Sequence, residues 1–205
     1  MKKLKETSIV IVILLLIFSN LKLINTTKQL NKEIHTKNQT ILTSFNVSSY
    51  SVLKTLNTSL SNNELYIGKN GFVINYLKKD IREMNNAILD LSNNVEGNNR
   101  VDLLPLVNIL DSFSVFLGSL YTHHKGHLEN SNEQEQYIDL DSNKIEGIIV
   151  IKETIADLIN IQNSVEGNKD RWIKILEELT HYSNNKDLED KRLKIEEINK
   201  SLTKG

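Results

Sequence analysis

The sequence predicts an all-α protein: an N-terminal transmembrane helix followed by a bundle of about four to six helices, with a long amphipathic first helix. Three observations predict this fold class. Residues 8–18 form an unbroken charge-free run that is apolar after Ser8, and Lys2, Lys3 and Lys5 precede it. One proline and eight glycines in 205 residues leave few positions that end a helix. Apolar residues also recur at helical spacing through most of the remaining chain.

Residues 1–25 are expected to be an uncleaved signal anchor. A basic start and a short apolar run also begin a secretory signal peptide, but no small-x-small cleavage site follows this run. A helix from Thr7 to Ile24 has 18 residues, and about 17–25 are needed to span a bilayer. The N-terminal lysines favour a cytoplasmic N-terminus. We therefore expect a single-pass protein of the cell membrane with an extracytoplasmic body; a cleaved, secreted helical protein is the alternative.

Residues 26–62 are expected to form a long amphipathic helix that connects the anchor to the body. Its apolar residues recur in pairs every eleven positions. Because eleven residues make three helical turns, all the pairs share one stripe. The pairs are Leu30 with Ile34, Ile41 with Phe45, and Val52 with Leu56.

Residues 63–183 are predicted to form the helical bundle, after a break in the helical pattern at 61–71. An Asn-Gly turn signal in this break also allows a short hairpin between 65–67 and 72–76. A turn between two helices is favoured, because the next apolar residues follow a 4-3-4-3-4 spacing that only a helix places on one face. They are Leu77, Ile81, Met84, Ile88, Leu91 and Val95.

The most apolar helix of the body is predicted at 102–122, at the centre of the core. Pro105 fits its first turn, where a missing N–H costs least. A second membrane span at 103–121 is the alternative. Asn108 and Asp111 argue against it, because an Asp at the centre of a span costs about 3 kcal/mol. The apolar stripe consists of Leu103, Leu106, Leu110, Phe113, Leu117 and Leu120.

Two similar strings, 93–98 and 163–168, share the sequence Asn-x-Val-Glu-Gly-Asn. Each is interpreted as the turn of a helical hairpin, with Gly97 and Gly167 as left-handed helix stops. The polar stretch 122–142 between the two hairpins predicts a loop.

Three further helices are expected after this loop, at 144–165, around 172–182, and at 184–205. Asn143, with Glu146 three residues later, forms a plausible capping box for the first of them. The last is densely charged and is expected to be a solvated or coiled-coil-like tail. The apolar positions are Ile148, Ile151, Ile155, Leu158 and Val165; Trp172, Ile175, Leu176, Leu179 and Tyr182; and Leu188, Ile195, Ile198 and Leu202.

Composition narrows the function classes. The first 25 residues hold four Lys and one Glu, so 21 basic and 25 acidic residues remain in a mildly acidic body. Such a body offers no basic face for a nucleic acid. The absence of cysteine excludes disulfides, thiolate chemistry and cysteine-bound zinc.

Three of the five histidines lie close together, at His123, His124 and His127. On a helix, His123 and His127 share one face and could bind one metal ion. Protonation of the three imidazoles could also make the cluster pH-responsive. A helix C-terminus itself favours cationic imidazole, which explains the cluster without any ligand.

A second candidate site resembles the start of an EF-hand calcium loop. Asp139, Asp141 and Asn143 match its first, third and fifth positions. However, Lys144 stands where the loop needs glycine, and Val150 where it needs glutamate. The sequence therefore favours helix N-capping by Asp141 or its neighbours over a calcium site.

No catalytic motif is recognised in the chain, and no cofactor is expected. The leading hypothesis is therefore a non-enzymatic, extracytoplasmic interaction or sensing module. Its expected partners are the membrane and either a protein partner or a second copy of the chain. The alternatives are a metal- or pH-responsive module and an enzyme whose site is assembled from scattered residues.

Overall fold

The computed structural model describes the backbone of residues 2–94, 103–128, 137–167 and 171–204. It describes their side chains from Leu14 onwards, apart from 126–128 and 204. The chain divides into two compact units, Met1–Gln39 and Thr40–Gly205.

The first unit is the N-terminal part of helix α1 (Lys2–Asn62). From Leu14 to Ile24 its large apolar side chains are all exposed. The following turns are polar, and the Thr26 and Thr27 hydroxyls each donate to the carbonyl oxygen four residues earlier, at 3.0 Å. These bonds satisfy the hydroxyls within the helix itself.

The predicted N-terminal transmembrane helix is only partly covered by the described residues, because side chains 1–13 lie outside them. Among the described residues, one helix is long and apolar enough to cross a membrane, and it is Leu104–Lys125. The structure therefore establishes that residues 2–25 are helical, and the membrane span stays a prediction.

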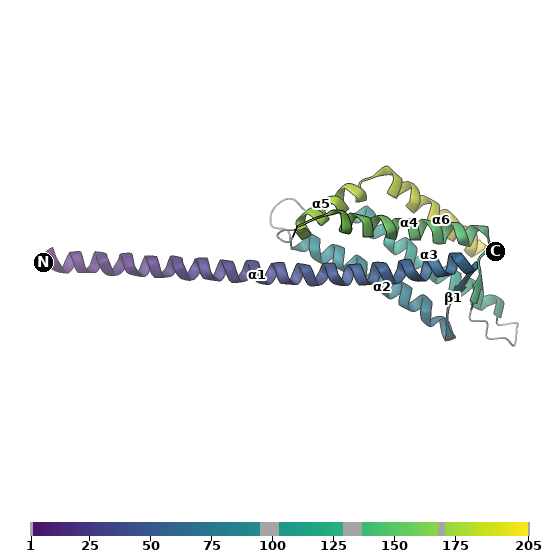
Figure 1. Ribbon diagram of the computed structural model, residues 1–205, viewed down its shortest axis with the longest axis horizontal. Helices are drawn as coiled ribbons and strands as arrows, with labels where there is room; N and C mark the ends of the chain where they lie inside the picture. Colours follow the sequence, from purple (N-terminus) through teal and green to yellow (C-terminus); the bar gives the residue numbers. More distant parts are fainter. Residues whose placement is uncertain (1, 95–102, 129–136, 168–170, 205) are drawn as a thin grey trace. The chain divides into compact units, whose positions relative to one another are not determined.

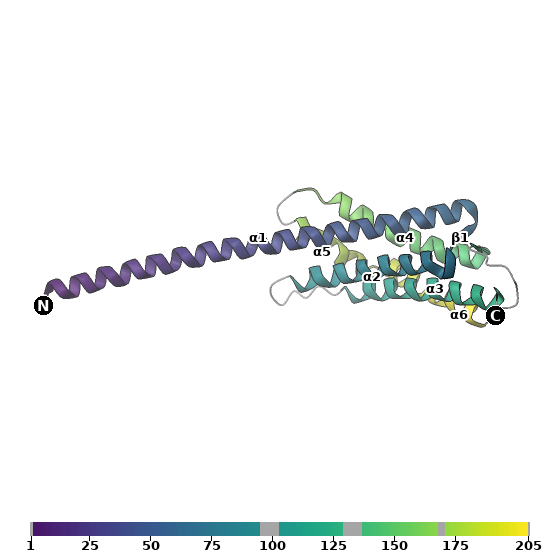
Figure 2. The same cartoon turned by 90° about the horizontal axis from the view of Figure 1, so that it is seen from below.

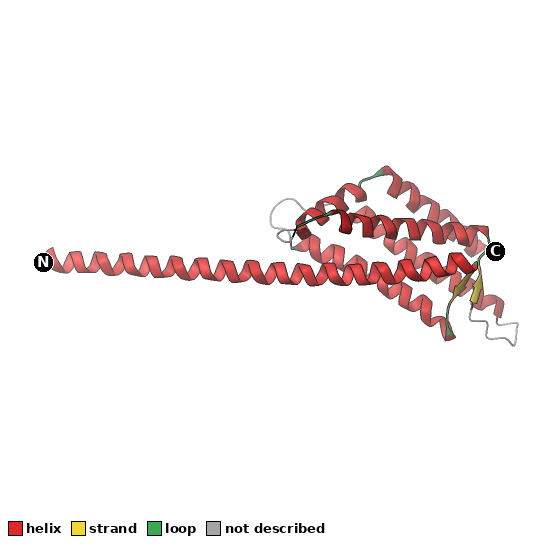
Figure 3. Cartoon of the chain, viewed as in Figure 1, coloured by secondary structure: helices red, strands yellow, loops and turns green. Residues whose placement is uncertain are grey.

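The second unit is a helical bundle (Figures 1 and 2). This confirms the predicted bundle of four to six helices. Figure 3 shows that the described part of the unit is mostly helical, with one small sheet and short connections between the elements. The bundle contains the C-terminal part of α1, α2 (Phe72–Asn93), α3 (Leu104–Leu128), α4 (Ser142–Ser164), α5 (Arg171–Ser183) and α6 (Lys186–Lys204).

In the second unit, α1 packs through the predicted apolar stripe. Phe45, Val52 and Leu56 are at most 1 % exposed. On the flank of this stripe, the Ser51 hydroxyl donates to the Asp80 carboxylate of α2 at 2.6 Å. The eleven-residue pattern therefore identified the core-facing side of α1 within this unit.

Helix α3 is the central helix of the bundle, because it contacts α2, α4, α5 and α6. Pro105 lies in its first turn, as predicted. Asp111 accepts a 2.7 Å hydrogen bond from the Asn85 amide of α2, so its carboxylate has a polar partner within the bundle. The fully buried side chains of α3 are Leu106, Ile109, Leu110, Phe113, Phe116 and Leu117.

A two-stranded antiparallel sheet was not predicted. β1 (Glu64–Tyr66) pairs with β2 (Tyr137–Asp139), about seventy residues away, and Leu65 lies opposite Ile138. Both of these side chains are buried. The predicted alternative of a local hairpin is wrong, because α2 begins at Phe72. The favoured prediction of a helix-to-helix turn is correct in that α2 follows directly. It did not include β1, which pairs with a distant segment.

Two predicted helix ends differ from the structure. Helix α3 continues to Leu128, so the predicted loop at 122–142 begins later. Helix α4 ends at Ser164, three residues before Gly167, which does have the positive φ (113°) expected of a glycine stop. The Arg171 guanidinium binds the end of α4, donating to the Gln162 carbonyl at 2.7 Å and the Val165 carbonyl at 3.0 Å. The other predicted stop, Gly97, lies outside the described residues.

Helix α6 is not the solvated tail that its charge predicted. Its apolar side chains enter the core, where Leu188 and Ile195 are at most 1 % exposed, and it packs against α3 and α4. Of its charged residues, Arg192 pairs with Glu189 and Glu196 along the helix, whereas Lys191 and Lys194 pair with carboxylates of α4. The charged residues do not occupy the side of α6 that carries Leu188 and Ile195, so this side packs into the core.

Candidate functional site

A cavity of about 500 Å³ lies in the second unit, between the beginning of α2, the C-terminal half of α3 and the end of α6. Ile74, Val115 and Leu202 form apolar parts of its wall. Lys78 and His123 contribute the basic groups, and no acidic residue lines the cavity. Its size is within the range of about 300–1,000 Å³ that is typical of small-molecule sites.

Gly118, in the interior of α3, makes room for the Lys78 ammonium group. A Cβ atom at Gly118 would lie 3.2 Å from Lys78 Nζ and 3.9 Å from Lys78 Cε. A glycine in a helix interior costs about 1 kcal/mol relative to alanine. Here the glycine leaves room for the end of the lysine side chain against α3.

The polar groups of the cavity differ in whether they already have hydrogen-bond partners. The hydroxyls of Thr122 and Thr203 donate to backbone carbonyls of their own helices. Within the described residues, the side chains of Asn75 and Ser119 make no hydrogen bond, and Lys78 makes no ion pair. The ammonium, an amide and a hydroxyl therefore line one cavity with their donors uncommitted.

The structure places the three predicted histidines differently. His123 lines the cavity and is half-buried. His124 follows it on α3, and its Nε2 atom is buried without a hydrogen-bond partner among the described residues. The side chain of His127 lies outside the described residues. No group of three metal-ligating side chains occurs in the described part of the chain, and the His123–His127 pair stays a prediction.

The predicted alternative to a calcium site, helix N-capping, is confirmed at Asp141. The capping box predicted at Asn143 with Glu146 is wrong, because α4 already begins at Ser142. Asp141 is the N-cap of α4 and accepts a hydrogen bond from Lys144 N at 3.0 Å. The Lys144 ammonium lies 2.8 Å from the Asp141 carboxylate and donates to the Asp139 carbonyl at 3.0 Å. Partial burial raises the pKa of Asp141, but the hydrogen bonds and charge of Lys144 outweigh it and lower that pKa overall. The Lys144 ammonium is therefore the cation that contacts the oxygens of Asp139 and Asp141, which the calcium-loop pattern had assigned to a metal ion.

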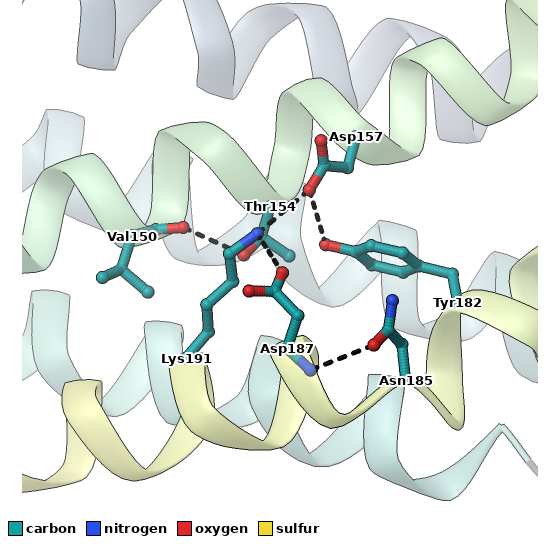
Figure 4. Close-up of polar contacts among 7 residues, drawn as sticks. All are labelled: Val150, Thr154, Asp157, Tyr182, Asn185, Asp187 and Lys191. Atoms are coloured by element: carbon teal, nitrogen blue, oxygen red, sulfur yellow. Dashed lines mark hydrogen bonds and ion pairs between the residues drawn. The ribbon is translucent and has the colours of Figure 1, made fainter.

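A polar cluster joins α4, α5 and α6 (Figure 4). The Tyr182 hydroxyl donates to Asp157 Oδ2 at 2.9 Å. Lys191 Nζ lies 3.1 Å from the same oxygen and 2.9 Å from an Asp187 oxygen. Figure 4 shows the lysine between the two carboxylates. One carboxylate of α4 therefore holds a side chain from each of the two following helices.

The protonation states of this cluster favour a structural role. Burial raises the pKa of the Tyr182 phenol, and the negative charge of Asp157 raises it further. Desolvation lowers the pKa of Lys191, but its hydrogen bonds to Asp187 and Asp157 raise that pKa overall. Both groups keep their protons at neutral pH, whereas a general acid or base works best with a pKa near that pH. The cluster serves as a cross-link between helices.

No protein-family model, characterised protein or solved structure shows significant similarity to this chain.

The sequence analysis missed Lys78, Asn75 and Ser119. One available signal was Gly118, because a glycine inside a strongly apolar helix often marks a close approach by another group. The pattern alone does not say which group approaches, since Lys78 lies on another helix forty residues earlier in the chain.

Proposed function

We propose that the chain is a membrane-anchored helical module whose body lies outside the cytoplasm and acts by binding a ligand or a protein partner. The single observation that carries the attachment is the exposed apolar part of α1. Eight large apolar side chains between Leu14 and Ile24 are each at least 50 % exposed.

The angular distribution of these side chains supports a lipid environment. Residues 14–18 are five consecutive apolar residues, and successive residues of a helix are about 100° apart. They therefore surround the helix completely, as expected for a membrane span and not for one apolar face on water. Burying eight such side chains is worth on the order of 10 kcal/mol, which is enough to favour insertion in a bilayer over exposure to water.

The body supports binding more than catalysis. Its most extensive cluster of ionisable groups holds protonated Tyr182 and Lys191 in fixed contacts. Its cavity combines apolar walls with uncommitted hydrogen-bond donors, and among the described residues none of its lining residues is acidic. This set of groups can hold a ligand without providing a nucleophile and a matched base.

Cysteine labelling tests the topology, because the natural chain has no cysteine. Val47→Cys and Leu193→Cys place thiols at positions that are 66 % and 50 % exposed in the body. A membrane-impermeant maleimide should label both in intact cells and should label Lys3→Cys only after permeabilisation. Labelling of Lys3→Cys alone in intact cells would place the body in the cytoplasm.

A metal-responsive module is the second candidate function. It is favoured by one observation: α3 continues as a helix through Leu128, so the backbone places residues 123 and 127 one turn apart on the same side. Zinc that binds the folded state should raise the melting temperature with the logarithm of its concentration. This rise should disappear in His123→Asn, and its absence from the natural protein would exclude the candidate.

A further inference from the structure

We propose that the cavity lined by α2, α3 and α6 binds a small organic carboxylate through the ammonium group of Lys78. This inference rests on the proposed function as a binding module, but it does not depend on membrane attachment. The cavity, the cation and the uncommitted donors are three separate observations that favour the same class of ligand.

The charge of the cavity favours an anion. Lys78 is half-buried, and no carboxylate of the described residues lies within ion-pair distance of it. By contrast, its neighbour Lys79 is 65 % exposed and pairs with Glu83 at 3.5 Å. A partly desolvated ammonium without a counter-ion gains more from an anionic ligand than an exposed, paired one does.

The position of Lys78 over Gly118 directs this charge into the cavity. Both residues line it, and the ammonium lies against the one residue of that stretch that has no side chain. An alanine Cβ at 3.2 Å would make the ammonium move by a few tenths of an ångström. The glycine thus acts as a positioning residue for the charge.

The remaining lining distinguishes an organic carboxylate from an inorganic anion. Ser119, next to Gly118 on α3, and Asn75, one turn before Lys78 on α2, offer neutral donors. A carboxylate has two oxygens that accept several such bonds. Ile74, Val115 and Leu202 offer apolar contact to the body of the ligand, and the Val115 side chain is 56 % exposed. Hydrated inorganic anions gain nothing from these apolar walls.

Three four-carbon probes of similar size test the assignment: butyrate, 1-butanol and butylammonium. Each is titrated at constant ionic strength into the full-length protein in detergent micelles, with binding measured by calorimetry and by thermal unfolding. We expect butyrate to bind and to raise the melting temperature, and the neutral and cationic probes to do neither. Inorganic phosphate at the same concentration should bind more weakly than butyrate.

Matched lysine variants locate the site. Lys78→Met keeps most of the apolar stem and removes the ammonium, and it should weaken butyrate binding at least about tenfold. Lys79→Met is the control on the neighbouring residue and should bind butyrate like the natural protein. Gly118→Ala should weaken binding with an unchanged or slightly higher melting temperature, because it shifts the ammonium without disturbing the core.

Several outcomes overturn the proposal. They are the absence of butyrate binding at millimolar concentration, equal binding of butyrate and 1-butanol, and equal loss of affinity in Lys78→Met and Lys79→Met. None of them bears on membrane attachment, which is measured by extraction and labelling. The two proposals therefore fail independently.

Discussion

Residues 14–24 of α1 and helix α3 are both rich in leucine, isoleucine and phenylalanine, but their side chains have opposite surroundings. In the first, eight large apolar side chains are at least 50 % exposed. In the second, the stripe from Leu106 to Leu120 is at most 1 % exposed. Total apolar content does not distinguish the two segments.

The angular distribution of polar residues does distinguish them. Helix α3 has a polar side that includes Asn108, Asp111 and Thr122, and Asp111 is hydrogen-bonded to Asn85 of α2. Residues 14–18 have no polar side at all. A helix with one apolar face can be buried by other helices, whereas an isolated helix that is apolar all round requires lipid or complete enclosure by protein.

The same substitution in both segments should have the most different effects. Leu110→Asp places an unpaired charge at a position that is 0 % exposed, and it should cost more than about 4 kcal/mol and unfold the body. Leu15→Asp lies at a position that is 64 % exposed and should change the unfolding free energy by less than about 0.5 kcal/mol. Circular dichroism during urea unfolding measures both. Near-natural stability of Leu110→Asp would show that α3 does not form the core.

Gly147 and Gly118 report on two sides of α3: the side that packs in the core, at Phe116, and the side that lines the cavity, at Gly118 itself. A Cβ at Gly147 of α4 would lie 2.4 Å from the ring of Phe116, which is 0 % exposed. Gly147→Ala should therefore cost about 1–3 kcal/mol through overpacking. Gly118→Ala meets only the end of the flexible Lys78 side chain and should be neutral, or stabilise by up to about 1 kcal/mol. The order of their melting temperatures checks the assignment, and a reversed order would contradict it.

Gln162 is the reverse case of residues 14–24. Those residues expose apolar side chains, whereas Gln162 buries a polar one. It is 0 % exposed, and neither amide atom has a hydrogen-bond partner among the described residues. Gln162→Met keeps the length and removes the unpaired dipole, so it should stabilise the body by about 1 kcal/mol. Gln162→Glu, which buries a charge, should destabilise it. Destabilisation by the methionine in equilibrium unfolding would mean that the amide has a partner, such as an ordered water.

The smallest expected effect concerns the surface of the bundle, at Asp141. The pKa of Asp141 is lower in the folded state, so its charge stabilises the fold above the unfolded pKa of about 4. This contribution is lost as the pH falls through the lower, folded value. Asp141→Asn keeps the cap acceptor and should cost a few tenths of a kcal/mol at neutral pH, and the difference should vanish once the pH is below the folded pKa. A difference that grows on acidification would contradict this assignment.

The sequence predicted the helices, because their buried residues recur at a regular spacing along the chain. The apolar positions of α2 at Leu77, Ile81 and Leu91 are all buried, because a helical period reports directly which side packs. Pairing of Leu65 with Ile138 could not be predicted in this way, since a three-residue strand has no period and its partner is remote. The packing of α6 was missed because its charges dominate its composition, although Leu188 and Ile195 mark its buried side.

The candidate site was predicted much less well than the fold. His123 was singled out for its neighbours in the sequence, and it does line the cavity. Lys78 was overlooked, because it is one of many lysines and its environment depends on Gly118 of another helix. A binding site of this kind is formed where three helices pack together. No short stretch of the sequence contains the residues that line it.

The retention of the full-length protein in membranes washed with alkaline carbonate tests the central claim most directly. The account predicts that the natural protein stays in the membrane with its N-terminus intact. It also predicts that Leu15→Asp lowers the retained fraction, because an Asp in a span costs about 3 kcal/mol, while the body stays folded. Release of the natural protein by carbonate, or a mature chain that begins within 19–25, would contradict it.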